Sequence, residues 1–258
     1  MYGNAGLKGR IMLWLIKNPY PMADRIIAIS KDVKTSLERV GVDSCRMVVI
    51  HNFIDHRVID GSKGPTLPIP QDKRVIISEG RLVEQKDFPS LLRAFAIVRL
   101  ALDARLVIIG EGPLRKQLER LAGRLKVAGD VLFTGWLANP FGADPQASVF
   151  VLCSRYEGFG NVIVEAMACG LPVICTDSPG GPAEILGNGA FGKLVGVGDV
   201  REIADSILEV LIDPVVQETM RRQSLIRANA YRVETLAPRY LEGLDASPAP
   251  GLLPSPEI

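Results

Sequence analysis

Residues 157–174 read EGFGNVIVEAMACGLPVI, the stretch with the clearest local pattern in this chain. A glycine-containing turn is followed by an apolar run that favours a helix, and Gly-Leu-Pro then ends that run. The pattern predicts a helix that begins near Gly160 and Asn161 and ends before Gly170. The short apolar strand 173–175 follows. A turn, a helix and a strand in this order indicate one unit of an alternating α/β fold.

Two carboxylates, Glu157 and Glu165, bracket the start of this predicted helix. The first N–H groups of a helix lack intrahelical partners and the helix dipole is positive there, so the segment favours phosphate. Glu165 is expected on the second turn, about 6–8 Å along the axis, where it can accept hydrogen bonds from a ribose diol. Glu157 is expected across the phosphates, beside the group that they carry. The stretch therefore predicts a site for a sugar nucleotide, although each acid alone also fits a simpler role, as a helix cap (Glu157) or a solvated helix residue (Glu165).

The rest of the chain alternates short apolar runs with amphipathic segments. The expected strands are 25–30, 47–50, 75–78, 105–109, 131–134, 149–153 and 173–175. The expected helices are 31–39, with Ser30 as its cap, and 90–102, 114–125, 161–168 and 200–211. This alternation predicts a parallel sheet with helices on both faces, which binds ligands at the carboxyl ends of its strands. Residues 56–71, rich in Gly and Pro, are expected to be a linker, and residues 245–258 a flexible tail.

Seven segments in a fixed order carry a family resemblance that runs from about Ala23 to about Tyr240. They are ADRIIAISKDVKTSLERVGV, VIHNFID, SEGRLVEQKDFPSLLRAF, LVIIGEGPLRKQLE, VLFTGWL, the stretch quoted above and SPGGPAEIL. Together they resemble the donor-binding half of a retaining glycosyltransferase of the GT-B fold, glycosyltransferase family 4. The resemblance implies that residues 72–244 form a Rossmann-like, nucleotide-sugar-binding domain. It also implies that residues 1–55 are a remnant of the N-terminal acceptor-side domain, which would be largely absent.

The resemblance assigns catalytic roles to Arg81, Lys86 and Glu157. Arg81 and Lys86 would contact the donor diphosphate, for which a guanidinium fork and a mobile ammonium are suited, and Glu157 would hold hydroxyls of the donor sugar. A solvated charged loop is the alternative for either cation. The donor-binding residues are expected to be Gly80, Gly110, Trp136, Leu137, Phe159, Gly160, Asn161, Val162 and Glu165.

Several of these positions have alternative interpretations. The turn at Gly110 lacks the third glycine of a dinucleotide fingerprint because Arg115 stands there, which disfavours NAD. Trp136 can equally be a packing residue. Gly180 and Gly181 are expected to bring the backbone near the donor sugar. Neither histidine is given a role, and no metal site is recognised.

The implied function is transfer of a hexose or N-acetylhexosamine, with retention, from a nucleotide diphosphate sugar to an acceptor hydroxyl. UDP is the expected nucleotide and no cofactor is expected, because the cations take the place of a metal. Double displacement and same-face attack both remain open, since no nucleophile is evident. The alternatives are a donor-binding module or inactive remnant that needs a partner domain, and an epimerase of the same fold. A phosphorylase would need a pyridoxal-binding lysine motif, which we do not find.

Composition limits the classes of binding partner that the chain is expected to have. The chain has 30 basic and 29 acidic residues, which gives no indication of nucleic acid. The expected partners are the nucleotide sugar, an acceptor sugar or lipid-linked sugar, and a partner domain or second copy held by the apolar residues near the N-terminus. The apolar run 11–16 is too short to span a membrane, so a cytoplasmic protein, free or peripheral to the membrane, is expected. Cys153 and Cys175 fall in strand-like runs and are expected to be buried thiols.

Overall fold

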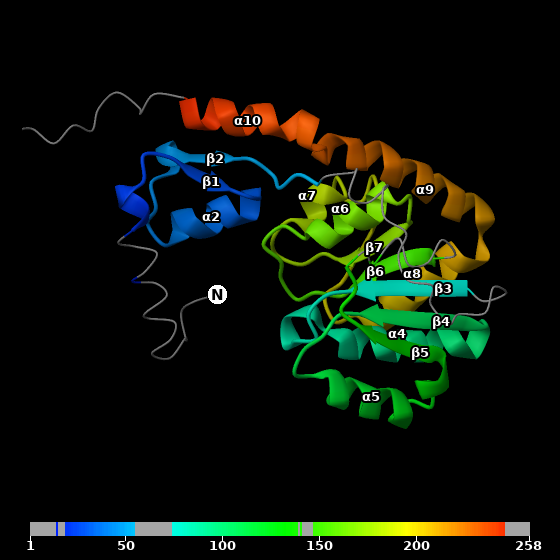
Figure 1. Ribbon diagram of the computed structural model, residues 1–258. Coiled ribbons are helices and arrows are strands. Elements are labelled where there is room, and N and C mark those ends of the chain that lie inside the picture. The colour runs from blue at the N-terminus through cyan, green and yellow to red at the C-terminus, as the bar shows by residue number, and fades with distance from the viewer. Residues whose placement is uncertain (1–13, 15–18, 55–73, 139, 141–146, 246–258) are drawn as a thin grey trace, which may run out of the picture.

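The computed structural model describes residues 14, 19–54, 74–138, 140 and 147–245 (Figure 1). Within these residues, the main sheet has six parallel strands in the order β5-β4-β3-β6-β7-β8. The strands are β3 (Arg74–Glu79), β4 (Ala104–Ile109), β5 (Val131–Gly135), β6 (Ala147–Leu152), β7 (Val173–Thr176) and β8 (Lys193–Val195). The chain proceeds from β3 toward one edge and then returns to place β6 on the other side of β3. The switch point, where such sheets bind ligands, therefore lies between β3 and β6.

Helices cover both faces of this sheet because successive strand residues point to opposite sides. Ile76 of β3 belongs to one buried cluster, with α4 (Phe88–Ala101), α5 (Arg115–Arg124) and α8 (Val200–Ile212). Val75 and Ile77 belong to the other cluster, with α6 (Asn161–Ala168) and α7 (Pro182–Ile185). The long helix α9 (Pro214–Ala228) contacts α6 and α8. Apolar strands buried on both faces are typical of a parallel sheet.

A smaller unit precedes the main sheet in the chain. Strands β1 (Ile26–Ala28) and β2 (Met47–Val49) are parallel and are connected through α2 (Lys31–Arg39). The side chain of Ser30 accepts a hydrogen bond from Val33 N at 3.2 Å, so Ser30 caps α2 as predicted. The C-terminal helix α10 (Val233–Asp245) returns to this unit (Figure 1). There the Tyr240 hydroxyl donates to the carbonyl oxygen of His51 at 3.2 Å.

The predicted α/β fold class is confirmed, and each expected strand and helix is present with small shifts at its ends. Strand β8 and helices α7, α9 and α10 were not among the expected elements. Helix α9 lacks an obvious apolar stripe because its buried positions are Met220, Ser224 and Ala228. The predicted linker 56–71 and residues 246–258 of the predicted tail lie outside the described residues, and the division into domains stays a prediction. The remaining helical turns are η1 (Tyr20–Met22), η2 (Ser44–Arg46), η3 (Glu84–Lys86), η4 (Ala128–Asp130) and η6 (Asn229–Tyr231).

Two further expectations concern cysteines and membranes. Cys153 and Cys175 are free and buried, as predicted, and burial raises the pKa of both thiols above their usual range. Among the described helices, none combines the length and the apolar character that crossing a bilayer requires.

Candidate functional site

A cleft of about 380 Å³ opens at the carboxyl ends of β3 and β6, where the strand order predicts a ligand site. Eight of the predicted site residues line it: Gly80, Arg81, Lys86, Glu157, Phe159, Gly160, Asn161 and Val162. Asn52, Glu79 and Gln85 also line it and were not predicted. Of these three, Glu79 left a signal in the sequence, because an acid that ends an apolar strand directly before a glycine has no packing reason to be there.

The centre of the cleft is an ion pair between Lys86 and Glu157. The Lys86 Nζ donates to Glu157 Oε1 at 2.5 Å, and the side chains are only 14% and 8% exposed. Ser154, a buried residue that the sequence analysis missed, donates its hydroxyl to the same oxygen at 2.6 Å. The carboxylate therefore holds the ammonium in a fixed position, as charge-assisted bonds do.

The loops after β3 and β6 are joined by hydrogen bonds beside this pair. Gln85 Nε2 donates to the carbonyl oxygen of Tyr156 at 2.9 Å, and Arg155 N donates to that of Gln85 at 2.8 Å. These bonds connect positions about 70 residues apart in the chain. The η3 turn that carries Lys86 and the loop that carries Glu157 are thereby held together.

A third loop, which contains Gly180 and Gly181, packs against the loop of Glu157. A Cβ on Gly180 would lie 1.9 Å from the carbonyl oxygen of Glu157, and one on Gly181 would lie 2.1 Å from that of Phe159. Gly180 N also donates to Asp32 Oδ2 at 2.8 Å. Close backbone neighbours therefore explain the need for glycine at both positions. That these glycines bring the backbone near the donor sugar stays a prediction.

The N-terminus of α6 faces the cleft. Gly160 precedes the helix with a φ of 99°, a conformation that favours glycine. Among the described residues, no side chain caps the first turn, and the Glu157 carboxylate bonds Lys86 and Ser154 instead. Glu157 is therefore not a helix cap, which removes that alternative. Asn161 Oδ1 accepts a hydrogen bond from Asn52 Nδ2 at 2.9 Å. Uncapped N–H groups beside a lysine make this end of the cleft suited to an anion.

Glu165, the second acid of the quoted stretch, does not line the cleft directly. Burial raises the pKa of its carboxyl, and its charge acts on Glu79 at the end of β3. Burial first, and then Glu165, raise the pKa of Glu79 to about 7, while Lys86 lowers it. Glu79 Oε2 is buried without a hydrogen-bond partner among the described residues. The role of Glu165 at a ribose stays a prediction.

The remaining predicted donor-binding residues, Gly110, Trp136 and Leu137, also lie outside the lining of the cleft. The backbone N–H of Gly110 donates to the carbonyl oxygen of Gly135 at 2.8 Å, which ties the loops after β4 and β5 together. Trp136 is 73% exposed, so it is not a packing residue within the described part of the chain. Leu137 is half-buried against the core. Their roles beside a base stay predictions.

The small N-terminal unit contacts the loops that form the cleft. Glu184 accepts from Lys31 N at 2.5 Å, and Glu184 Oε2 lies 2.8 Å from His51 Nε2. The His51 ring stacks on Phe159 with centroids 5.4 Å apart. Glu184 thus connects the small N-terminal unit to α7.

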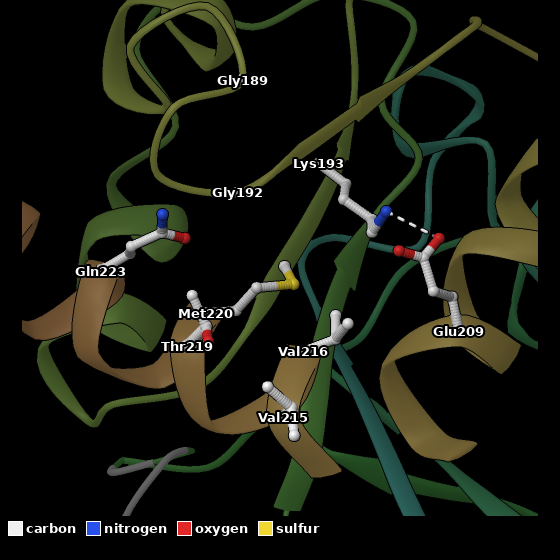
Figure 2. Close-up of a pocket in the computed structure, with 9 residues that line it drawn as sticks. All are labelled: Gly189, Gly192, Lys193, Glu209, Val215, Val216, Thr219, Met220 and Gln223. Carbon is white, nitrogen blue, oxygen red and sulfur yellow. Dashed lines mark hydrogen bonds and ion pairs between the residues drawn. The ribbon is translucent and has the colours of Figure 1, made fainter. Parts of the chain in front are cut away.

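A second hollow, of about 280 Å³, lies between β8, α8 and α9 (Figure 2). Lys193 is ion-paired with Glu209 at 2.8 Å, and no predicted site residue lines this hollow. Its walls are otherwise formed by aliphatic, glycine and neutral polar residues. We therefore assign the functional site to the cleft at β3 and β6.

Comparison with known proteins identifies the family of this chain. A model of the family described as glycosyl transferases group 1 matches residues 63–230, and one described as glycosyltransferase family 4 matches residues 1–58. A Campylobacter jejuni protein is 32% identical over 94% of this chain; its name is N-acetylgalactosamine-N,N'-diacetylbacillosaminyl-diphospho-undecaprenol 4-alpha-N-acetylgalactosaminyltransferase. The lipopolysaccharide core biosynthesis glycosyltransferase LpsD of Rhizobium meliloti is 30% identical over 86% of the chain. The chain spans 67% and 61% of these two relatives.

Solved structures share the fold. Anabaena Alr3699/HepE, in complex with UDP and glucose, superposes with a TM-score of 0.80 at 23% identity, over 92% of this chain and 67% of that protein. A Staphylococcus aureus TarM mutant superposes with a TM-score of 0.78 at 19% identity, over 94% of this chain and 48% of that protein. The fold is that of the GT-B glycosyltransferases, and the chain belongs to the glycosyl transferases group 1 family.

Proposed function

We propose that this chain carries the donor site of a retaining glycosyltransferase. The enzyme would transfer a hexose or N-acetylhexosamine from a nucleotide diphosphate sugar to an acceptor hydroxyl in polysaccharide or glycolipid synthesis. The observation that carries the proposal is the cleft at the switch point, where Arg81, the ion-paired Lys86 and the uncapped N-terminus of α6 come together. Fixed cations and aligned N–H groups stabilise the negative charge that grows on a departing diphosphate.

Glu157 has two tasks in this proposal. Its Oε1 holds Lys86, and both of its hydrogen bonds from described residues end on that atom. The other oxygen, Oε2, would accept from hydroxyls of the donor sugar. Arg81 is exposed and would contact the diphosphate from the cleft rim. Glu165 would bind the ribose, and Gly110, Trp136 and Leu137 would lie beside the base.

The finer assignments rest on resemblance. The sequence of the site resembles family 4 enzymes that retain anomeric configuration, and the choice between double displacement and same-face attack stays open. UDP is the proposed nucleotide, an assignment supported by the UDP and glucose in the structure of the Anabaena protein. The name of the Campylobacter relative includes an undecaprenol-linked acceptor, which supports a lipid-linked acceptor here. Such an acceptor would place a cytoplasmic enzyme at a membrane surface.

A second candidate function is donor binding without transfer by this chain alone. The chain spans 47–69% of the length of eight solved structures that it matches, so transfer to the acceptor would require a further domain or partner chain. This candidate predicts nucleotide binding without turnover, and turnover once the missing part is supplied.

The test is a thermal-shift series of the purified chain with UDP, GDP, ADP and uridine. A ligand at 100 times its dissociation constant adds about 2.7 kcal/mol of stability, which such an experiment detects. A shift with one diphosphate supports the site and names the base. If none of the four ligands shifts the transition, the donor-site proposal is wrong for this chain.

Variants then test the individual roles. Arg81→Ala with Lys86→Ala is expected to lose affinity for UDP but to keep that for uridine. Glu157→Ala is expected to weaken UDP-sugar binding more than UDP binding, and Glu165→Ala to weaken both. Equal losses for uridine and UDP in the Arg81 and Lys86 variant would contradict the diphosphate role.

A further inference from the structure

Glu79 is the charged residue of the cleft that the proposed function does not use. It ends β3 and lines the cleft beside Gly80 and Lys86. Its Oε2 atom is buried and has no hydrogen-bond partner in the described part of the chain. A buried carboxylate oxygen without a donor is costly, so such groups are normally paired, protonated or satisfied by a ligand or water.

The surroundings of Glu79 do not neutralise an ionised carboxylate. Glu165 of α6 adds negative charge, and Lys86 of η3, the cation whose charge acts on Glu79, is already bonded to Glu157. On the β4 side the register partner is Ile109, which carries no charge. Arg81, two residues further on, is exposed. The cleft is thus lined by two acids, Glu79 and Glu157, and by two cations, Arg81 and Lys86. Glu165 adds a further negative charge that acts on Glu79.

When two carboxyl groups interact in a partly buried site, ionisation of both is unfavourable. One of the two therefore tends to stay protonated. The pKa of Glu79 is raised to about 7, first by burial and then by Glu165. An incoming diphosphate adds further negative charge and disfavours the ionised form again. Binding of the ligand and protonation of this carboxyl should therefore favour each other.

From this arrangement we infer that Glu79 is a proton-carrying binding residue of the donor site. Its neutral carboxyl donates a hydrogen bond to an acceptor oxygen of the bound nucleotide sugar, and the cleft takes up a proton from solvent when the anionic ligand binds. The inference rests on the proposed function, because it needs an anionic ligand in this cleft. It adds a residue and a pH dependence to that function.

The size of the effect follows from the titration. With a pKa of about 7, the neutral fraction of Glu79 is about 0.9 at pH 6 and about 0.09 at pH 8. If only the neutral form binds, the affinity for the ligand falls about tenfold between these two pH values.

The experiment is calorimetric titration of UDP into the parent chain, Glu79→Gln and Glu79→Val at pH 6, 7 and 8, with each pH measured in two buffers of different ionisation enthalpy. Glu119→Gln, on the exposed side of α5 and away from the cleft, is the matched control. Neither Gln nor Val can ionise, but Gln keeps a hydrogen-bond donor and Val has none. Because the titration of UDP itself is common to all four proteins, differences between them isolate the carboxyl of Glu79.

The parent and Glu119→Gln are expected to lose about tenfold more affinity from pH 6 to pH 8 than Glu79→Gln does, and to take up protons on binding near pH 7. Glu79→Val should show no added pH dependence and bind about tenfold more weakly than Glu79→Gln, since it lacks the donor. Equal pH profiles for the parent and Glu79→Gln would overturn the inference while leaving the donor site intact. Equal affinities of the Gln and Val variants would overturn the hydrogen bond. Absence of binding by every protein at every pH would overturn the proposed function itself.

Discussion

The ion pair between Lys86 and Glu157 provides the sharpest test of how the site is built. Lys86→Met removes the ammonium but keeps most of the aliphatic stem, whose Cε lies 3.1 Å from the position of a Cβ on Gly80. The Glu157 carboxylate, only 8% exposed, then retains the Ser154 hydroxyl but loses its counter-charge. The variant therefore isolates the charge from the packing.

The expected loss in the free energy of unfolding is about 3 kcal/mol, the low end of the range for a broken buried pair, because the cleft admits water on one side. In a chain of this size, such a loss lowers the midpoint of thermal unfolding by about 6–12 °C. The double variant Lys86→Met with Glu157→Gln removes the unpaired charge as well. It should recover most of the loss, to within about 1 kcal/mol of the parent.

Urea denaturation at pH 7, followed by circular dichroism, measures these differences. The control is Lys193→Met, which breaks the pair with Glu209, where the side chains are 29% and 51% exposed. That change should cost less than about 1 kcal/mol. Two results would refute the interpretation of this pair as a buried, mutually dependent unit. One is a loss of unfolding free energy in Lys86→Met no larger than in Lys193→Met, and the other is no recovery of that free energy when Glu157→Gln is added.

Three further predictions follow from other contacts. Gly180→Ala should lower the thermal midpoint far more than Gly198→Ala, although both glycines have a positive φ. The Cβ at position 180 would lie 1.9 Å from the Glu157 carbonyl oxygen, whereas a Cβ at position 198 would meet nothing within 4 Å. The pKa of Glu79 rises from 4.5 in the unfolded chain to about 7 in the folded protein, so the parent should lose up to about 3 kcal/mol of stability between pH 4.5 and pH 8. Glu79→Gln should lack this loss when urea midpoints are compared across the same pH range. Ser30→Ala should cost about 1–2 kcal/mol in the same urea assay, because the hydroxyl both caps α2 and donates to the Gly158 carbonyl oxygen at 3.0 Å.

The sequence predicted the elements that depend on local chemistry. The helix that begins at Asn161 follows from a glycine turn and an apolar run, and the cap of α2 follows from a serine before a helix-forming segment. The strands of the main sheet are short apolar runs between turn residues, which is why their order along the chain could be read directly. It missed the edge strand β8, because three residues, Lys193–Val195, give no periodic signal.

The candidate site was predictable only as a set of residues. Arg81, Lys86 and Glu157 were identified from their motifs, and the carboxyl ends of parallel strands were the expected place for them. The ion pair between Lys86 and Glu157 was not predicted. The effect of the Glu165 charge, which raises the pKa of Glu79, was not predicted either. Motifs record which residue types a site needs, but not which of them satisfy one another.

By itself, then, the sequence determined the alternating elements and the residue types around an anion site, because each depends on neighbours within a few positions. The parallel sheet could be predicted because strands that alternate with helices form one. The tertiary structure alone decided that β6 lies beside β3, which brings the loops of Lys86 and Glu157 together across 71 residues. It also decided that Gly180 supports the Glu157 loop and that Glu79 is left with an unpaired buried oxygen. These features depend on long-range contacts. The order of the strands decides which loops meet, and it thereby decides which buried polar atoms have hydrogen-bond partners.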